Sequence, residues 1–245
     1  MFKHFVITRF NCVLPRFKDR WPDKYNKRLD KNYLNQRFAI FEKYTYKSII
    51  CQSNKNFEWI ILFDDKTSDE CLKRVKCGKE DFAITPLLIS EEDNAIECLD
   101  DYIFNNTKYV DYYITSRVDN DDMYSSDYIE TVQKFCSENG NNEYFISFPY
   151  GLQYDLDKDE LKEYIRKDNH FTTHFSGKKD GNLYGNIMNI NHTKLYDIGA
   201  EIKTINTDNP MWLEIVHESN CSNRKITEEI LDRDDTKKIM KRFYI

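Results

Sequence analysis

The feature that most constrains the fold is a regular alternation over residues 1–140. Short runs rich in β-branched and aromatic residues alternate with longer segments whose apolar residues recur at helical spacing. Strands alternating with helices are typical of a parallel sheet with right-handed crossovers. The sequence therefore predicts an α/β fold with a mostly parallel central sheet flanked by helices. Strands are expected at 4–10, 57–65, 82–89 and 112–119, and helices at 33–51, 93–105 and 125–139, with a further helix starting near 67–70.

Polar residues gather where three of these strands end. In a parallel sheet the carboxyl ends share one edge, and ligands bind in the crevice beyond it. We therefore expect the polar residues of the three strand ends to lie on the same rim. They are Arg9 and Asn11 after the first strand, Asp64 and Asp65 after the second, and Arg117, Asp119, Asp121 and Asp122 at the fourth.

The third of these clusters holds three carboxylates in four positions, Asp119, Asp121 and Asp122. Carboxylate oxygens suit a hard divalent cation such as Mg²⁺ or Mn²⁺, whose shell substrate phosphates and water complete. The cation would neutralise a diphosphate leaving group. The alternative is a solvated turn that caps the following helix, because Asp and Asn favour such turns.

The second half of the chain is less regular. Pro210 suits the first turn of a helix, with Asp208 or Asn209 as its cap. We expect a strand or hairpin at 145–156, a charged helix at 157–168, a strand pair at 181–191 and a helix at 210–220.

Composition limits the classes of partner. A net charge of −6 and a pI near 5.5 argue against a nucleic-acid-binding surface. No apolar run approaches the ~18 residues of a membrane span, and the seven dispersed cysteines fit neither a disulfide scaffold nor a zinc site. We expect a cytoplasmic protein. Its basic C-terminal tail, 226–245, is either a peripheral membrane contact or a docked terminal helix.

Two segments carry a resemblance. SIICQSNKNFEWIILFDDKTSDE (48–70) and DYYITSRVDNDDMYSSDYIE (111–130) resemble family-two glycosyltransferases. Together with PMWLEIVHESN, the stretches VITRFN and SRVDNDD resemble more closely a group of rhamnosyltransferases. The resemblance implies a GT-A (Rossmann-like) fold and one glycosyltransferase domain, 1–245. Within it, 1–125 would bind the nucleotide sugar, and 126–225 would bind the acceptor and carry out catalysis.

The resemblance also implies a reaction. A sugar would move from a nucleotide diphosphate sugar to a glycan or glycolipid acceptor, usually with inversion, with Mn²⁺ or Mg²⁺ as cofactor. Asp121 would bind the metal, with Asp119 near the ribose or a metal-bound water and Asp122 near the donor sugar or acceptor. Asp64, beside Asp65, would read the nucleotide base. Arg9, Asn11 and Arg117 would meet nucleotide or phosphate, although each Arg could instead pair with a nearby Asp.

An inverting transfer needs a base, which the family usually supplies as an E-D pair near a helix start. This chain has TDNPMWLEIVHESN instead, so Asp208 is the first candidate and Glu214 the second. His217 would complete the metal shell, contact the diphosphate or be structural. Trp212 would stack on a sugar ring or belong to the core.

Other classes of protein stay open to different degrees. A nucleotidyltransferase would require a Gly-rich phosphate loop after the first strand, and RFNCVLPRFKDR contains no glycine. An inactive nucleotide-sugar-binding module remains an alternative. A glycoside hydrolase would need two carboxylates facing each other across ~5 to 10 Å. HFTTH spaces His170 and His174 for zinc on a helix, but it lacks the glutamate of H-E-x-x-H.

Overall fold

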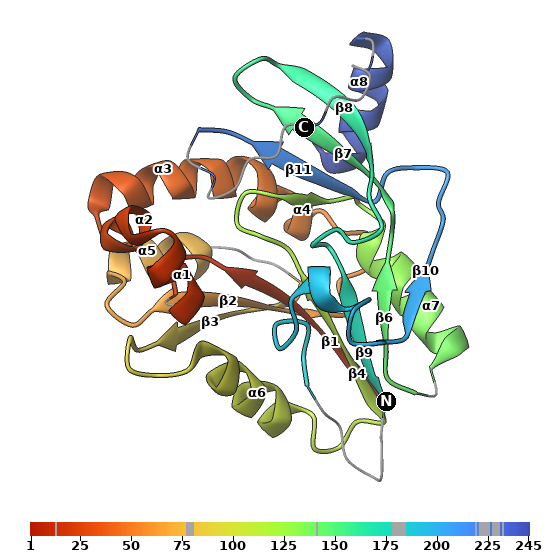
Figure 1. The fold of residues 1–245 in the computed structure, drawn as a ribbon, viewed down its shortest axis with the longest axis horizontal. Coiled ribbons are helices and arrows are strands. Elements are labelled where there is room, and N and C mark those ends of the chain that lie inside the picture. The colour runs from red at the N-terminus through yellow and green to blue at the C-terminus, as the bar shows by residue number, and fades with distance from the viewer. Residues whose placement is uncertain are drawn as a thin grey trace.

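The computed structural model describes residues 1–12, 14–76, 81–140, 142–177, 185–218, 220, 226, 231 and 233–245. The described strands form a seven-stranded main sheet and a smaller four-stranded sheet (Figure 1). The main sheet consists of β1 (Phe2–Arg9), β2 (Glu58–Asp64), β3 (Ala83–Ile89), β4 (Tyr112–Arg117), β6 (Tyr144–Ser147), β9 (Thr173–Gly177) and β10 (Ile202–Thr204).

The order of the main sheet is β10-β6-β9-β4-β1-β2-β3. Strands β3, β2, β1 and β4 pair in parallel, and β9 runs antiparallel between β4 and β6. The predicted α/β fold with a mostly parallel central sheet is confirmed. Because the chain builds outward from β1 to β3 and then returns to place β4 on the other side of β1, the strand order reverses between β1 and β4. A crevice for a ligand forms at such a point.

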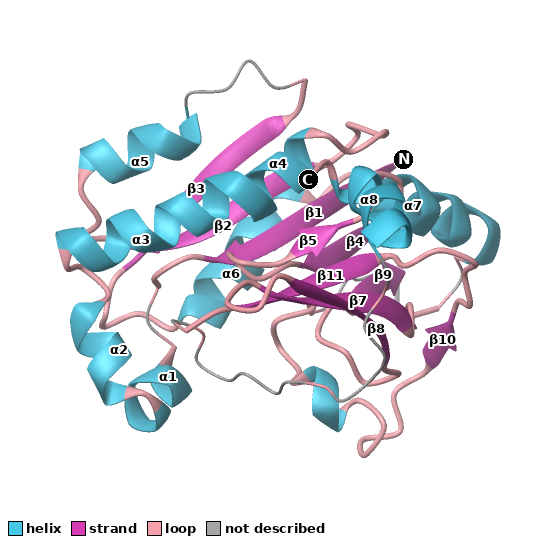
Figure 2. Cartoon of the chain, turned by 90° about the horizontal axis from the view of Figure 1, so that it is seen from above, coloured by secondary structure: helices cyan, strands magenta, loops and turns pink. Residues whose placement is uncertain are grey.

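Helices cover both faces of this sheet (Figures 1 and 2). Alternate strand residues point to opposite faces, so Val6 packs with the cluster that includes Phe38 and Val132, while Ile7 packs with the cluster that includes Leu99. The helices are α1 (Pro15–Arg20), α2 (Pro22–Lys27), α3 (Lys31–Phe41), the π-helix η1 (Glu42–Tyr46), α4 (Lys47–Ile50), α5 (Asp69–Lys76), α6 (Ala95–Asn106), α7 (Tyr128–Asn139) and the 3₁₀-helix η2 (His192–Lys194).

The smaller sheet begins at the rim of the main one. Its first strand, β5 (Met123–Tyr124), follows directly after Asp122. Its order is β5-β11-β7-β8, with β7 (Tyr150–Asp155), β8 (Glu160–Ile165) and β11 (Trp212–Val216). The acidic cluster therefore lies in the link between the two sheets.

Three predictions for the second half are wrong. Residues 212–216 are strand β11, not a helix, because their aromatic and β-branched side chains are buried between β5 and β7, with Leu213 opposite Leu152. The predicted helix at 157–168 is strand β8, which returns along β7 after a turn with positive φ at Asp159. Residues 185–191 contain no strand, and the rest of that predicted strand pair, 181–184, lies outside the described residues. Residues 145–156 form β6 and β7, which lie in different sheets and so make no hairpin.

The C-terminal tail is docked. It contains α8 (Arg233–Met240) and the 3₁₀-helix η3 (Lys241–Phe243). Phe243 is fully buried in a cluster with residues of the smaller sheet, and Arg242 donates two hydrogen bonds of 2.9 Å to Asp127. In the described part of the chain, every helix is too short or too polar to cross a bilayer.

Candidate functional site

A cavity of about 490 Å³ opens where the strand order reverses. It is in the size range of small-molecule sites. The walls come from the carboxyl ends of β1 and β4, helices α1 to α3, strand β11, and the segments around His170 and His192. Of the rim residues expected to converge, Arg9, Asn11, Arg117, Asp119, Asp121 and Asp122 line it.

Asp119 is held by two arginines from neighbouring strands. Arg9 donates to both carboxylate oxygens at 3.1 and 3.2 Å, and Arg117 donates to the same two oxygens at 2.9 to 3.1 Å. Burial alone would raise the pKa of Asp119, but the charges of Arg117 and Arg9 outweigh it and hold that pKa well below the ordinary value. One carboxylate thus faces two guanidinium groups, leaving a local surplus of one positive charge.

Asp121 has separate partners on other elements. Arg37 of α3 donates to it at 3.1 Å, and His217, just after β11, lies 3.1 Å from the same oxygen. Burial opposes ionisation of Asp121, yet the Arg37 charge and the His217 hydrogen bond lower its pKa. The structure therefore brings His217 to Asp121 as expected. Arg37, also bonded to Asn120, was not anticipated.

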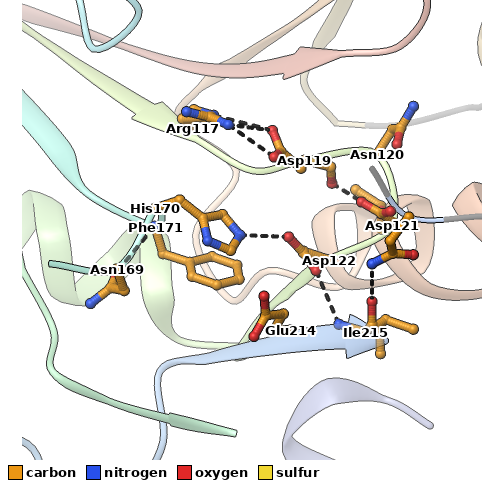
Figure 3. Close-up of polar contacts among 12 residues, drawn as sticks. Arg117, Asp119, Asn120, Asp121, Asp122, Asn169, His170, Phe171, Glu214 and Ile215 are labelled. Carbon is orange, nitrogen blue, oxygen red and sulfur yellow. Dashed lines mark hydrogen bonds and ion pairs between the residues drawn. The ribbon is translucent and has the colours of Figure 1, made fainter. Parts of the chain in front are cut away.

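Asp122 pairs with a histidine from the loop before β9. His170 Nε2 lies 2.7 Å from one oxygen of Asp122, and the Ile215 N–H donates to the other at 3.0 Å (Figure 3). Burial raises the pKa of Asp122 to about 7, and the hydrogen bond from His170 only partly offsets it. For His170 the balance is reversed, because the bond to Asp122 outweighs burial and raises its pKa.

Asp119, Asp122 and His170 could hold a metal ion, since one ligand atom of each lies within 4.8 Å of the others. Opposite ligands of an octahedral ion at about 2.1 Å are about 4.2 Å apart, so a small shift would place all three in one shell. Two carboxylates with an imidazole fit Mn²⁺ better than Mg²⁺, which rarely takes a nitrogen ligand. The cluster differs from the predicted set of Asp119, Asp121 and His217. HFTTH was the only sequence signal for His170, and its second histidine, His174, instead contacts Glu143.

Glu214 lies in the cavity wall and Asp208 does not. Glu214, on β11, is half-buried, and one of its oxygens accepts a 2.8 Å hydrogen bond from Gln153. Asp208 is exposed in the loop before β11 and is not among the cavity residues. Of the two candidates for the catalytic base, only Glu214 therefore lies in the cavity wall.

Asp64 is sealed away from the cavity. It is fully buried, and the Nε of Arg28, a residue of the cavity wall, donates to it at 2.9 Å. Asn11 joins the two strand ends, accepting from the Asp64 N–H at 3.1 Å and donating to the Arg28 carbonyl at 3.1 Å. Asp65 is exposed and is not among the residues that line the cavity. The structure therefore presents Arg28, and not an acid, at this end of the cavity.

Trp212 is a core residue, so sugar stacking by it is excluded. It is 1% exposed, stacks on Phe171 at 4.7 Å and donates from Nε1 to the Phe148 carbonyl at 2.7 Å. Its ring lies against Gly151, where an added Cβ would come within 2.1 Å. Both faces of the indole are therefore occupied by the protein.

The chain is similar to several solved structures, all at low sequence identity and with TM-scores below 0.5, and it spans less than two thirds of the length of the first of them. S. aureus TarS 1–349 in complex with UDP-GlcNAc has 13% identity and a TM-score of 0.47, covering 98% of this chain and 65% of that chain. Another structure of S. aureus TarS 1–349 has 13% identity and a TM-score of 0.46, covering 87% of this chain and 60% of that one. A "Putative Glucose-1-Phosphate Thymidylyltransferase" from Bacillus anthracis has 9% identity and a TM-score of 0.43, covering 86% and 89%.

The sequence itself matches one family. No curated protein matches significantly, but residues 3–229 match the family model described as "Putative rhamnosyl transferase". This confirms the resemblance to rhamnosyltransferases found in VITRFN, SRVDNDD and PMWLEIVHESN. Because the match extends over nearly the whole chain, the protein belongs to this rhamnosyl transferase family.

Proposed function

We propose that this protein transfers a sugar from a nucleotide diphosphate sugar to a hydroxyl of a glycan or glycolipid acceptor, with inversion at the anomeric carbon. The observation that carries the proposal is the convergence of Asp119, Asp122, His170 and Glu214 with two arginines at one cavity. Family membership supports the class of reaction, and the family description suggests rhamnose as the sugar.

Arg9 and Arg117 are the groups we assign to the donor diphosphate. They share Asp119, and guanidinium groups bind phosphate oxygens as well as they bind carboxylates. Their surplus positive charge favours a dianionic ligand. On donor binding, both would turn from Asp119 to the diphosphate and leave that carboxylate free for a cation.

Asp119, Asp122 and His170 are the ligands we assign to Mn²⁺. The bound ion would stabilise the negative charge of the leaving diphosphate. Since ligand groups must lose their protons, Asp122 and His170 would release the proton they share. Asp121, held by Arg37 and His217, would shape this wall of the cavity.

Glu214 is our assignment for the catalytic base. Gln153 holds one of its oxygens, which leaves the other to accept the proton of the acceptor hydroxyl. As that hydroxyl oxygen bonds to the anomeric carbon, the bond from this carbon to the diphosphate breaks and its electron pair leaves with the diphosphate. Arg9 and Arg117 bind the charge released.

Arg28 is the group we assign to the nucleotide base, in place of Asp64. Arg28 is among the residues that line the cavity, and its guanidinium is fixed by Asp64 at 2.9 Å and Glu91 at 3.1 Å. A guanidinium is a donor only, so it would read carbonyl oxygens of a base. Asp64 would act through Arg28.

The test is donor turnover. The protein would be incubated with UDP-glucose, GDP-mannose or dTDP-rhamnose, a mixture of glycan and glycolipid acceptors, and Mn²⁺ or EDTA, and the nucleoside diphosphate released would be measured. We expect release from one donor class only, dependent on Mn²⁺, and at least about 100-fold lower in Glu214→Gln. Asp208→Asn is the matched control, an exposed acid off the cavity. No release from any donor would refute the proposal, and equal loss in both variants would refute the assignment of the base.

A further inference from the structure

Two stacked tyrosines lie beneath the site without reaching it. The rings of Tyr124 and Tyr128 are parallel within 4° with centroids 3.7 Å apart, and both side chains are fully buried. Tyr124 belongs to β5, directly after the acidic cluster, and Tyr128 begins α7. Neither is among the cavity residues in the described part of the chain. Any effect they have on the site must pass through other groups.

Each tyrosine hydroxyl holds a backbone carbonyl next to a site residue. Tyr124 donates to the Arg117 carbonyl at 2.7 Å, two residues before Asp119. Tyr128 donates to the Phe171 carbonyl at 2.6 Å, one residue after His170. Asp119 and His170 come from segments about 50 residues apart, and the stacked rings set the spacing between the two carbonyls.

A buried chain of hydrogen bonds leads to the hydroxyl of Tyr128. The Gln133 amide is oriented by its neighbours, since its oxygen accepts from Asn54 at 3.0 Å and its nitrogen donates to the Asn56 carbonyl at 2.8 Å. Its nitrogen therefore also donates to His4 Nδ1, 3.2 Å away. Because Nδ1 accepts, the proton of the neutral ring is on Nε2, which donates to Ser116 Oγ at 2.8 Å.

The direction of the chain is set at its other end, because the Phe171 carbonyl can only accept and so takes the proton of Tyr128. The contact of 3.1 Å then runs from Thr173 to the Tyr128 hydroxyl, and the contact of 2.6 Å runs from Ser116 to Thr173. Each hydroxyl accepts one bond and donates the next, an arrangement in which successive bonds polarise one another. A tyrosine that only filled space in the core would not need its hydroxyl to take part in such a chain of hydrogen bonds.

We propose that Tyr124 and Tyr128 are a positioning pair that sets the separation of Asp119 and Asp122 from His170, and thereby the affinity of the cation site. The proposal rests on the proposed function, because it assumes that these three residues bind Mn²⁺. Groups that orient metal ligands contribute about 10- to 100-fold to metal affinity. Their loss should weaken cation binding more than it weakens the fold.

The experiment compares three Tyr→Phe variants of the full chain, each of which keeps the ring and removes only the hydroxyl. Tyr124→Phe and Tyr128→Phe delete the two carbonyl contacts. Tyr144→Phe is the matched control: Tyr144 is 1% exposed and stacked on Phe175 at 4.6 Å, and its hydroxyl interacts with the Cys136 thiol rather than with a carbonyl beside the site. The Mn²⁺ dissociation constant would be measured by calorimetric titration with saturating UDP, GDP or dTDP present, because Arg9 and Arg117 leave Asp119 only when a diphosphate binds. The thermal midpoint would be measured in EDTA.

We expect Mn²⁺ to bind about tenfold more weakly in Tyr124→Phe and Tyr128→Phe, and unchanged in Tyr144→Phe. Mn²⁺ affinities within twofold of wild type in both variants, with only a lower midpoint in EDTA, would overturn the positioning role and leave the proposed function intact. If wild type and Asp119→Asn bind Mn²⁺ equally, or wild type does not bind it, the cation site itself falls and the positioning role falls with it.

Discussion

Two strand ends of the main sheet look alike in sequence and differ in the folded protein. Strand β2 ends in Asp64 and Asp65, and β4 is followed by Asp119, Asp121 and Asp122. Asp64 is fully buried under Arg28, whereas the three acids after β4 line the cavity. The difference lies in the cations, because Arg28 stands between Asp64 and the cavity while Arg9 and Arg117 flank Asp119 from within it. An acid at a strand end is therefore available to a ligand only if its partner can move away.

Asp119→Asn gives the sharpest test of this contrast. The substitution keeps the shape of the side chain but removes the charge that pairs with Arg9 and Arg117. We expect donor turnover to fall by about 10³-fold, the effect of losing a preorganised charge at the reaction centre. The measurement is kcat for release of nucleoside diphosphate, with Asp65→Asn as the exposed control. Activity above a tenth of wild type would contradict the assignment.

Asp64→Ala should damage the fold instead. It leaves the Arg28 guanidinium without its buried partner and the Lys66 N–H without its acceptor. Breaking a buried pair by removing one partner costs about 3 kcal/mol. Urea unfolding would measure the loss, and Asp65→Ala should change the free energy of unfolding little. Equal stability of the two variants would show that the pairing of Asp64 with Arg28 does not stabilise the fold.

The raised pKa of Asp122 should be visible in how the free energy of unfolding depends on pH. Its pKa is raised from an ordinary 3.8 to about 7, mainly by burial. Between about pH 4 and 7 the folded chain keeps a proton that the unfolded chain has released, so the contribution of Asp122 to stability falls as pH rises across that window. Below it both states are protonated, and above it both are ionised.

The Asp122→Asn variant should lose this pH dependence. In wild type it should change the free energy of unfolding, measured in EDTA, by on the order of 2 kcal/mol between about pH 4 and 7. Asn can still accept from the Ile215 N–H and contact His170. Parallel stability curves for wild type and variant between pH 4 and 7 would be evidence against a raised pKa at Asp122.

A double variant separates the two roles of Arg28. Arg28→Met with Asp64→Asn removes both charges, and replacing both members of a buried pair is often close to neutral for stability. We expect near wild-type unfolding but about tenfold weaker binding of the preferred nucleotide among UDP, GDP and dTDP, about 1.4 kcal/mol. Unchanged nucleotide affinity would place the base elsewhere in the cavity.

The sequence predicted the first half of the fold because that half is built from local patterns. The strands β1 to β4 and the helices α3 to α6 follow from apolar runs and helical spacing within single segments, whereas α1 and α2 were not predicted. The prediction for 210–220 was wrong because the run WLEIV is apolar on nearly every position and gives no clear period. Pairing with β5 and β7, which are distant in sequence, decides that it is a strand.

The candidate site divides in the same way. The acids of the β4 end, and Arg9 and Arg117, were found from the sequence, because the parallel order of the strands brings their carboxyl ends to one rim. Their partners were not. His170 lies 48 positions from Asp122, in the stretch HFTTH, whose spacing suggested zinc and not a partner for Asp122. Arg37 lies 84 positions from Asp121, in a segment with no motif. Arg28, which takes the place of Asp64 in the cavity, belongs to a loop that no pattern connects to β2.

The sequence by itself thus determined which carboxylates lie at the edge of the sheet. Only the tertiary structure decided which of these carboxylates face the cavity and which arginine or histidine side chain pairs with each. It also decided that two of them can meet one metal ion together with a histidine. The physical reason is the distance along the chain over which each kind of interaction acts. Strand and helix formation follow from the spacing of neighbouring residues, whereas a buried charge must be matched by an opposite charge or hydrogen-bond donors from wherever the fold brings them.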